Sequence, residues 1–337
     1  MKDLFQRWGL LSFVFVFMLA ILAACGTDKG TDGAAKEDSV DEESIEVVEE
    51  VEDEEVVEAF PVTFTDDVGR EVTIESEPKT IVSIQASNTE ILYALGVGDR
   101  LIGVSDYDNY PEEALSVQKV GAQDMDAELV LSLLPDIAFV TTYHHNTHEN
   151  ILKQYEDAGI TVVVTGSAST FDDVYKTMDM IAQATGTAEK ADEIINDMKD
   201  RRVALEEKAK GITDTKKVWV EVSPAPDIFT TGKNTFMHEM LEAINATNAA
   251  EEQDGWVKMT EEEIVQLNPD VIITTYGYYI DNPAEQVLTR DGWAEVTAIK
   301  NEQVFDVDSD TVTRPGPRLI EGVETLAKII YPEVFGE

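Results

Sequence analysis

Two stretches of the chain, more than a hundred residues apart, repeat one another, and this repeat constrains the fold more than any other feature. The stretch AELVLSLLPDIAFVTTY at 127–143 is matched by EEEIVQLNPDVIITTY at 261–276. In each, a glutamate (Glu128 or Glu262) stands seven residues before a Pro-Asp pair, and an apolar run ending in Thr-Thr-Tyr follows. Apolar residues recur behind each glutamate at helical spacing, which predicts a short helix packed before a buried strand. The repeat therefore indicates two similar α/β units in one chain.

Both glutamates are predicted to lie on the outward side of the first turn of their helices, because the apolar residues behind them face a core. A carboxylate at this place also interacts favourably with the helix dipole, so one such glutamate would be ordinary. Two glutamates at matching places leave open both an ordinary structural role and a paired role in docking to a partner.

Strand and helix patterns alternate from residue 60 to residue 186, which predicts an α/β lobe with a mostly parallel sheet. The stretch FPVTFTDDVGREVTIES predicts a hairpin that precedes this sheet. Ser87 and Glu90 have the spacing of a capping box at the start of a predicted helix, and Gly96 is expected to end it. Strands are expected at 80–84, 101–105, 137–142 and 160–166, and further helices at 127–134 and 149–158.

Residues 187–210 form a strong helix pattern without glycine or proline. At 1.5 Å per residue, such a helix would span roughly 35 Å. Its apolar positions include Ala191, Ile194, Ile195, Met198, Val203 and Leu205.

The alternation of strands and helices resumes over residues 211–337. The last predicted helix, GPRLIEGVETLAKII, is expected to have Pro317 as its first residue. The prediction is an α/β protein of two Rossmann-like lobes, 60–186 and 211–337, joined by the single long helix 187–210. A ligand cleft is expected between the lobes.

The first 24 residues read as a signal peptide: a weakly basic start is followed by a short apolar run that small residues close. The sequence LAAC at 22–25 resembles the lipobox of bacterial lipoproteins, which implies cleavage before Cys25 and lipid attachment to its thiol. Cys25 is the only cysteine, so no disulfide can form within the chain. The resemblance implies anchoring in the lipid bilayer at the extracytoplasmic face of the cell membrane, of the Gram-positive type. An ordinary membrane anchor with an incidental cysteine is the alternative.

The segment after the signal peptide, 25–59, is dense in acidic residues, which predicts a disordered tether beyond the lipidated Cys25. A helical acidic stalk is the alternative. The net charge of the chain is −43, and the acidic excess continues through the lobes. Such a surface repels phosphate backbones, so no nucleic-acid partner is expected. It suits a protein that works at high ionic strength, where salt screens the repulsion.

Three stretches resemble one known family: PKTIVSIQASNTEILYALGVGDRLIGVSDYDNYPEEA, LLPDIAFV and RPGPRLIEGVETLAKIIYPE. They are similar to the substrate-binding proteins of ABC importers that have a rigid linking helix and capture cobalamin or ferric siderophores. The resemblance runs from Phe60 to Glu337. It implies a monomer that delivers its ligand to a permease dimer, with Glu128 and Glu262 at positions that meet arginines of the two permease subunits.

The sequence is most similar to those of the cobalamin-binding members of this family. This resemblance implies five cleft residues. These are Tyr107, Phe229, Trp256, Asp310 and Arg314. Where cobalamin binders place a tryptophan on the first lobe, this chain has Ala122, so a smaller corrinoid, haem or a ferric siderophore remains open. Each aromatic residue has an alternative as half-buried packing, and Arg314 as a surface partner of acidic neighbours.

Three of the four histidines, His144, His145 and His148, lie together in TTYHHNTHEN. They follow a predicted strand, where loops of α/β folds line clefts. His144 and His148 are one helical turn apart, a spacing that suits a metal chelate. A zinc or manganese receptor, a contact to the bound chelate and a plain polar loop all remain open.

No enzyme motif stands out. The stretch GVGDRLIG at 96–103 runs from a predicted helix into a strand, which is the reverse of a phosphate-binding loop. The sequence contains no G-x-S-x-G motif. We therefore expect a binding protein without a cofactor of its own, whose transported ligand is a corrinoid or an Fe(III) chelate. A structural surface protein that binds no small molecule is the remaining alternative.

Overall fold

The computed structural model describes residues 60–336. The expected signal peptide, the lipidation site at Cys25 and the acidic tether lie outside the described residues. The chain enters with the predicted hairpin, formed by β1 (Val62–Thr65) and β2 (Glu71–Ile74), which pair antiparallel. The carboxylate of Asp66 fixes the turn by accepting the backbone N–H groups of Val68 and Arg70.

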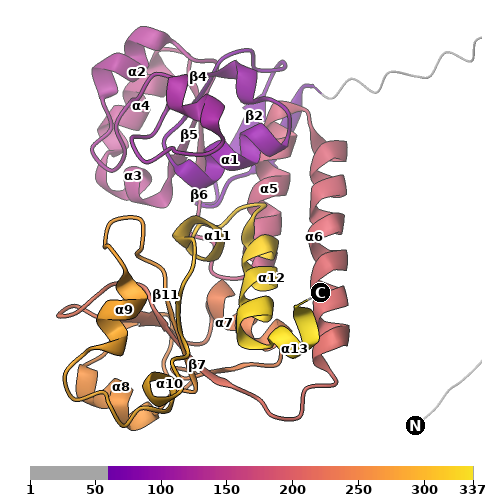
Figure 1. Ribbon diagram of the computed structural model, residues 1–337. Coiled ribbons are helices and arrows are strands. Elements are labelled where there is room, and N and C mark those ends of the chain that lie inside the picture. Colours follow the sequence, from indigo (N-terminus) through magenta and orange to yellow (C-terminus); the bar gives the residue numbers. More distant parts are fainter. Residues whose placement is uncertain (1–59, 337) are drawn as a thin grey trace, which may run out of the picture. The chain divides into compact units, whose positions relative to one another are not determined.

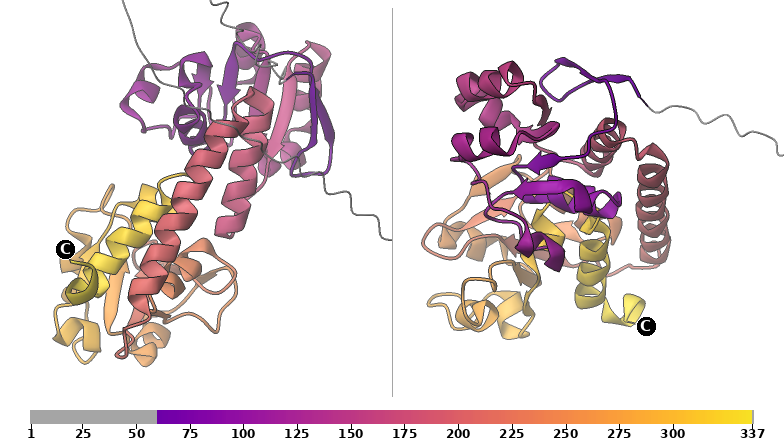
Figure 2. Two further views of the ribbon diagram at one scale, coloured as in Figure 1. Left: turned by 90° about the vertical axis from the view of Figure 1, so that its right-hand side faces the viewer. Right: turned by 90° about the horizontal axis from the view of Figure 1, so that it is seen from above.

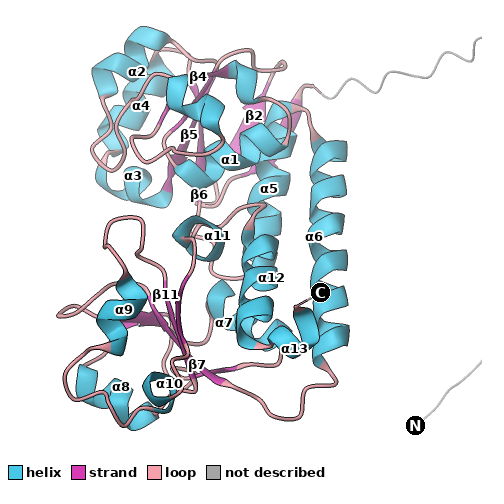
Figure 3. Ribbon diagram, viewed as in Figure 1, coloured by secondary structure: helices cyan, strands magenta, loops and turns pink. Residues whose placement is uncertain are grey.

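The N-terminal lobe is built on a sheet of four parallel strands in the order β4-β3-β5-β6 (Figures 1 and 3). The strands are β3 (Ile81–Ser83), β4 (Leu101–Val104), β5 (Ile137–Thr141) and β6 (Thr161–Thr165). The helices around them are α1 (Ala86–Ala94), α2 (Ala127–Leu133), α3 (Thr142–Thr147) and α4 (Glu149–Asp157), with the short turns η1 (Gly98–Arg100) and η2 (Glu112–Ser116).

The C-terminal lobe repeats this plan in a second parallel sheet of order β12-β11-β7-β9. Its strands are β7 (Lys217–Glu221), β9 (Thr247–Asn248), β11 (Val271–Thr274) and β12 (Val304–Asp306). Its helices are α7 (Phe236–Ala243), α8 (Glu261–Leu267), α9 (Pro283–Leu288) and α10 (Thr297–Lys300), and β8 (Phe229–Thr231) pairs antiparallel with β10 (Trp256–Lys258). In both sheets the first strand lies inside, with the second on one flank and the third and fourth on the other.

The repeated phrase of the sequence marks the same place in both lobes. It forms α2 and β5 in one lobe and α8 and β11 in the other, so β5 and β11 are equivalent third strands. Each helix ends at a residue of positive φ before proline, Leu134 (46°) and Asn268 (47°). The aspartates after the prolines accept backbone N–H groups at the start of the neighbouring strand, Asp136 from Thr80 and Asp270 from Lys217, both at 2.9 Å. The Pro-Asp pair thus ends a helix and aligns two strands.

The long helix α6 (Ala188–Ala209) runs along both lobes (Figure 2). It packs against α5 (Phe171–Thr185) on the N-terminal side and against α7, α12 (Leu319–Ile330) and α13 (Pro332–Phe335) on the C-terminal side. The buried side chains of these helices belong to one apolar cluster that continues into both sheets. Each sheet buries its opposite face in a separate cluster of its own lobe. Alternate residues of each strand therefore enter different cores, as in Ile81 and Val82 of β3.

The predicted fold class is confirmed: two α/β lobes with parallel sheets are joined by one long helix. Two local predictions were wrong. Ser87 lies inside α1, whose N-cap is Gln85, and α12 begins at Leu319, two residues after Pro317. Among the apolar residues of α6, Val203 is 53% exposed.

The longest of the helices that were not predicted is α5. The helix α5 is capped at its start by the side chain of Thr170, which accepts the N–H of Asp173, and at its end by Gly186 at φ 73°. Both caps are readable in the sequence. Within residues 60–336, no helix is long and apolar enough to cross a membrane.

Because α6 contributes to the core of both lobes, truncating its buried side chains should destabilise the whole protein. Met198 is 1% exposed, and Met198→Ala is expected to lower the free energy of unfolding by about 2–5 kcal/mol. Val203→Ala, on the exposed face of the same helix, should change it by less than about 0.5 kcal/mol. Urea unfolding followed by circular dichroism measures both. Equal midpoints for the two variants would contradict a core that passes through α6.

Candidate ligand-binding site

A cavity of about 720 Å³ lies where the carboxyl ends of the two sheets face one another. The N-terminal lobe contributes residues that follow β3, β4, β5 and β6, and the C-terminal lobe contributes residues that follow β11 and β12. In the N-terminal sheet, the second strand lies on one side of β3 and the third on the other. Open α/β sheets bind ligands at such a change of direction, outside the carboxyl ends of their strands. The topology therefore explains where the cavity is.

Tyrosines from both lobes provide the aromatic surface of the cavity. Tyr107 is 73% exposed and Tyr278 is 78% exposed, and Tyr143 lines the same cavity. Only Tyr107 was predicted. Tyr143 ends the first copy of the repeated phrase, but its counterpart Tyr276 is buried and donates its hydroxyl to the buried carboxylate of Glu221 at 2.7 Å. The repeat could have pointed to Tyr143, whereas nothing periodic in the sequence points to Tyr278.

Phe229 and Trp256 lie elsewhere on the C-terminal lobe. They belong to the antiparallel pair of β8 and β10, in which Phe229 is opposite Lys258 and Trp256 is opposite Thr231. Both side chains are exposed, and neither lines the cavity. The structure thus brings together three of the five expected cleft residues, Tyr107, Asp310 and Arg314, and leaves these two aromatic residues outside.

Arg314 is the only guanidinium among the described residues that line the cavity, and its donors are already engaged. It donates to Asn109 Oδ1 at 2.9 Å, to Asp310 Oδ1 at 2.8 Å and to the carboxylate of Glu90. Asp310 in turn accepts from Asn109 Nδ2 at 2.9 Å. Asn109 and Glu90 belong to the N-terminal lobe, so this cluster connects the two walls of the cavity.

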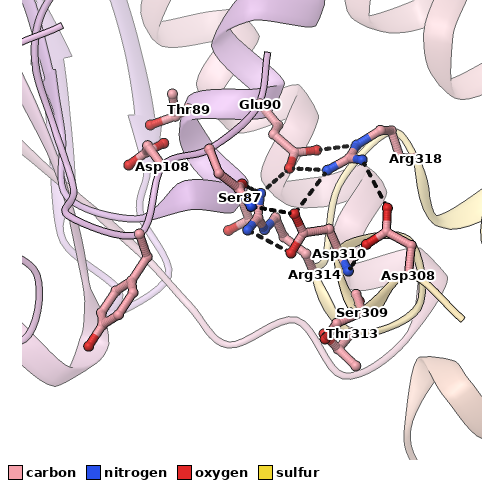
Figure 4. Close-up of polar contacts among 12 residues, drawn as sticks. Ser87, Thr89, Glu90, Asp108, Asp308, Ser309, Asp310, Thr313, Arg314 and Arg318 are labelled. Atoms are coloured by element: carbon pink, nitrogen blue, oxygen red, sulfur yellow. Dashed lines mark hydrogen bonds and ion pairs between the residues drawn. The ribbon is translucent and has the colours of Figure 1, made fainter. Parts of the chain in front are cut away.

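Glu90 lies at the centre of this connection (Figure 4). Its side chain is 2% exposed and binds both Arg314 and Arg318, with Arg318 Nε at 2.9 Å from Oε2 and Nη2 at 2.6 Å from Oε1. Arg318 also lies over the ring of Tyr110, 3.8 Å from its centroid. Burial alone would lower the pKa of Arg318, but the hydrogen bond to Glu90 and its charge raise it, so the guanidinium stays charged. Glu90 therefore joins the lobes, in place of the capping role predicted for it.

The three histidines do not form the metal site that was considered. Nδ1 of His144 accepts the backbone N–H of Thr141 at 3.2 Å, so Nε2 carries the proton and donates to the carbonyl of Ala122 at 2.8 Å. His148 contacts the carbonyl of Gln123 at 3.1 Å through its own Nε2. Burial lowers the pKa of His144. Across residues 60–336, no three His, Cys, Asp or Glu side chains gather to hold a metal ion. His144 and His148 hold the loop that forms one cavity wall.

The two glutamates of the repeat are exposed, as predicted. Glu128 and Glu262 are the second residues of α2 and α8. Neither forms a salt bridge to another residue that the structure describes. Figure 1 shows α2 and α8 on different lobes, both on the side of the molecule away from α6. The two free carboxylates thus lie on one side of the molecule, one on each lobe.

Removing the central carboxylate of the connection should be costly, because two buried guanidinium groups would lose their counter-ion. Glu90→Gln is expected to lower the free energy of unfolding by about 3–5 kcal/mol. Glu206→Gln, which breaks a partly exposed pair with Arg202 on α6, should cost less than about 1 kcal/mol. Urea unfolding with constant m-values measures both. A Glu90→Gln midpoint equal to that of Glu206→Gln would rule out a connection of this strength.

The sequence has clear relatives. The profile of the periplasmic binding protein family matches residues 81–311. An uncharacterized ABC transporter substrate-binding lipoprotein of Bacillus subtilis, YvrC, is 51% identical over 282 residues, which cover 83% of this chain and 88% of the relative. A cobalamin-binding protein of Halobacterium salinarum is 28% identical over 282 residues, 81% of this chain and 75% of the relative.

Among solved structures, a possible iron-binding periplasmic solute-binding protein of Staphylococcus epidermidis has a TM-score of 0.68 and 33% identity, over 76% of this chain and 100% of that one. These similarities agree with the two-lobed fold and with a cavity between the lobes. The chain therefore belongs to the periplasmic binding protein family, as a substrate-binding protein of an ABC transporter that works with a permease in the membrane.

Proposed function

We propose that this protein captures a corrinoid, or a ferric chelate of similar size, in the cavity between its lobes and hands it to the permease. The observation that supports this ligand class is the cavity itself, with about 720 Å³ and exposed tyrosines on both walls. Ligand sites of this size commonly combine apolar and aromatic walls with a few polar anchors. The asparagine, serine and glutamine side chains along the cavity provide such anchors.

Flat metal chelates suit this wall, because aromatic rings stack against planar surfaces. Tyr107 and Tyr143 extend from the N-terminal lobe and Tyr278 from the C-terminal lobe, so a ring between them would be contacted from both sides. Ala122, at the place of the tryptophan that the resemblance leads one to expect in cobalamin binders, does line the cavity. Tyr143 directly precedes His144, whose ring donates to the carbonyl of Ala122. Tyr143 therefore offers an aromatic surface on the same wall as Ala122.

The relatives support the ligand class from their own descriptions. One is described as cobalamin-binding and one solved structure as possibly iron-binding. The family is one of solute-binding proteins, so we propose binding without catalysis. The zinc or manganese alternative lacks support because His144 and His148 bind backbone carbonyls.

The ligand can be identified by titrating cyanocobalamin, dicyanocobinamide, haemin, a ferric siderophore and zinc into the full chain, with calorimetry as the readout. One corrinoid or ferric chelate is expected to bind at one site, and zinc to give no heat. Tyr278→Ala should weaken that binding about tenfold, because stacking and buried area are lost. Trp256→Ala, an exposed aromatic outside the cavity, is the matched control and should leave affinity unchanged. The reverse order of effects would move the site away from this cavity.

We further propose that the protein acts as a monomer and docks on a permease dimer through Glu128 and Glu262. Both carboxylates are exposed, and each lies in the first turn of a helix with its own N-cap, Asp126 or Thr260. An arginine of the permease would form a charge-assisted hydrogen bond with each. Two such contacts, one on each lobe, would fix the orientation of the delivery complex.

Charge reversal separates docking from ligand binding. The double variant Glu128→Arg and Glu262→Arg is expected to abolish uptake of the ligand into cells while leaving its Kd unchanged, because neither residue lines the cavity. Glu189→Arg is the matched control: Glu189 is also an exposed glutamate in a first helical turn, on α6 at the other side of the molecule. It should leave uptake intact. A parallel loss of affinity in the double variant would refute this division of roles.

We place the protein at the extracytoplasmic face of the cell membrane, of the Gram-positive type, held by lipid on Cys25. The LAAC sequence and the description of the Bacillus subtilis relative as a lipoprotein support this anchor. The acidic segment 26–59 would then separate the lobes from the bilayer. Lipidation at Cys25 gives stable anchoring when two or more acyl chains are attached.

A further inference from the structure

We propose that the cavity selects chelates whose edge groups are uncharged or cationic, such as carboxamides, and rejects chelates that carry several free carboxylates. The inference rests on the proposed function and adds to it the charge and the edge chemistry of the ligand. It follows from three features of the wall: its charged groups, the engagement of its single guanidinium and the helix end that faces it.

The charged groups on the described wall are few and mostly acidic. Among the residues that line the cavity, the formally charged side chains are Asp308, Asp310 and Arg314. His144 is held as a neutral ring by the N–H that it accepts and the carbonyl to which it donates. Asp108, next to Tyr107, is buried behind the wall and does not line it. Two carboxylates against one guanidinium give the wall a negative formal charge.

That one guanidinium is not free to bind an anion. Arg314 already meets the carboxylates of Glu90 and Asp310 and the amide oxygen of Asn109, and its side chain is 13% exposed. An anionic ligand would have to displace one of these partners. Displacing Glu90 would leave its buried carboxylate with Arg318 as its remaining counter-ion and would break a buried ion pair, which is unfavourable.

Asp308 provides a second obstacle to anions. Its side chain is 62% exposed, and Arg318 Nη1 lies at 3.9 Å from it. Its carboxylate accepts the backbone N–H of Asp310 and so caps α11 (Ser309–Thr313), which cancels the positive end of that helix. A carboxylate on the edge of a ligand would therefore approach a like charge at this wall.

One feature of the wall favours acceptors. The start of α1, at Gln85, Ala86 and Ser87, lines the cavity and has no side-chain cap. A helix N-terminus carries about half a positive charge, which is less than the charge of one carboxylate, and its N–H groups can donate to a carbonyl oxygen. A carboxamide satisfies both sides of the wall: its oxygen can accept from α1, and its N–H can donate to Asp308 or Asp310.

Two corrin rings with different edges test this preference. Dicyanocobinamide carries carboxamides, and dicyanocobyrinic acid carries carboxylates on the same ring. In low-salt buffer, the full chain should bind the amide at least about tenfold more tightly, since each carboxylate near Asp308 costs roughly fivefold in affinity. Added salt should narrow the gap because it screens the repulsion. This comparison needs only the native protein.

Asp308→Asn removes one negative charge and keeps an N-cap side chain, so it should narrow the affinity gap by about fivefold. The melting temperature should fall only slightly, because the partly exposed pair with Arg318 contributes little to stability. Asp192→Asn makes the same charge change on the exposed surface of α6 and should leave the gap unchanged. Equal effects of the two variants would show a diffuse charge effect and overturn the assignment to this wall.

The outcomes distinguish this inference from the proposed function. If dicyanocobyrinic acid binds as tightly as dicyanocobinamide, the proposed charge preference is wrong, while the proposed corrinoid function is supported. If neither corrin ring binds, a corrinoid ligand is ruled out. The charge preference is then tested by comparing the affinities for a neutral ferric hydroxamate and a trianionic ferric catecholate. Tighter binding of the catecholate, or binding of neither, overturns it.

Discussion

The apolar core that α6 shares with both lobes holds the two sheets and the cavity between them in place. Side chains of α6 pack with α5 in one lobe and with α7 and α12 in the other, so a single cluster runs through both sheets. A hinge between the lobes would have to open this cluster and bend a continuous helix of 22 residues. The separation of the cavity walls is therefore set by packing at the side of the molecule away from α2 and α8.

The buried carboxylate of Glu90 reinforces this frame beside the cavity. It forms ion pairs with two arginines of the other lobe, and one of these, Arg314, is also part of the cavity wall. Lobe position and wall chemistry therefore share one residue. The same frame fixes the spacing of α2 and α8 and therefore the separation of the two carboxylates that we propose for docking.

The sequence predicted those parts of the molecule that follow from local pattern. The repeat located α2–β5 and α8–β11, and helical periodicity located α6. The role of Glu90 was beyond local reasoning, because its partners Arg314 and Arg318 lie 224 and 228 residues away in the chain. Its spacing from Ser87 predicted a capping box, but α1 begins one residue earlier, at Ala86, with Gln85 as its N-cap. The missed helix α5 shows the opposite failure, since its caps were legible in the sequence.

The site was only half predictable for the same reason. Tyr143 and Tyr276 end the two copies of the repeat, but only Tyr143 lines the cavity. Tyr276 is buried in the C-terminal lobe, where it donates to Glu221, the partner of Arg290. Tyr278 lines the cavity instead. Such exchanges depend on long-range partners. The resemblance implies Trp256 as a cleft residue, whereas Trp256 lies opposite Thr231 in the β8–β10 pair and is not among the residues that line this cavity. If the shared core fixes the lobes, the distance between α2 and α8 does not change when a ligand binds. This distance can be measured by electron–electron double resonance between spin labels at Ser132 on α2 and Gln266 on α8, in a Cys25→Ser background. We expect the same distance distribution with and without saturating dicyanocobinamide, and a shift larger than the width of that distribution would show that the lobes move.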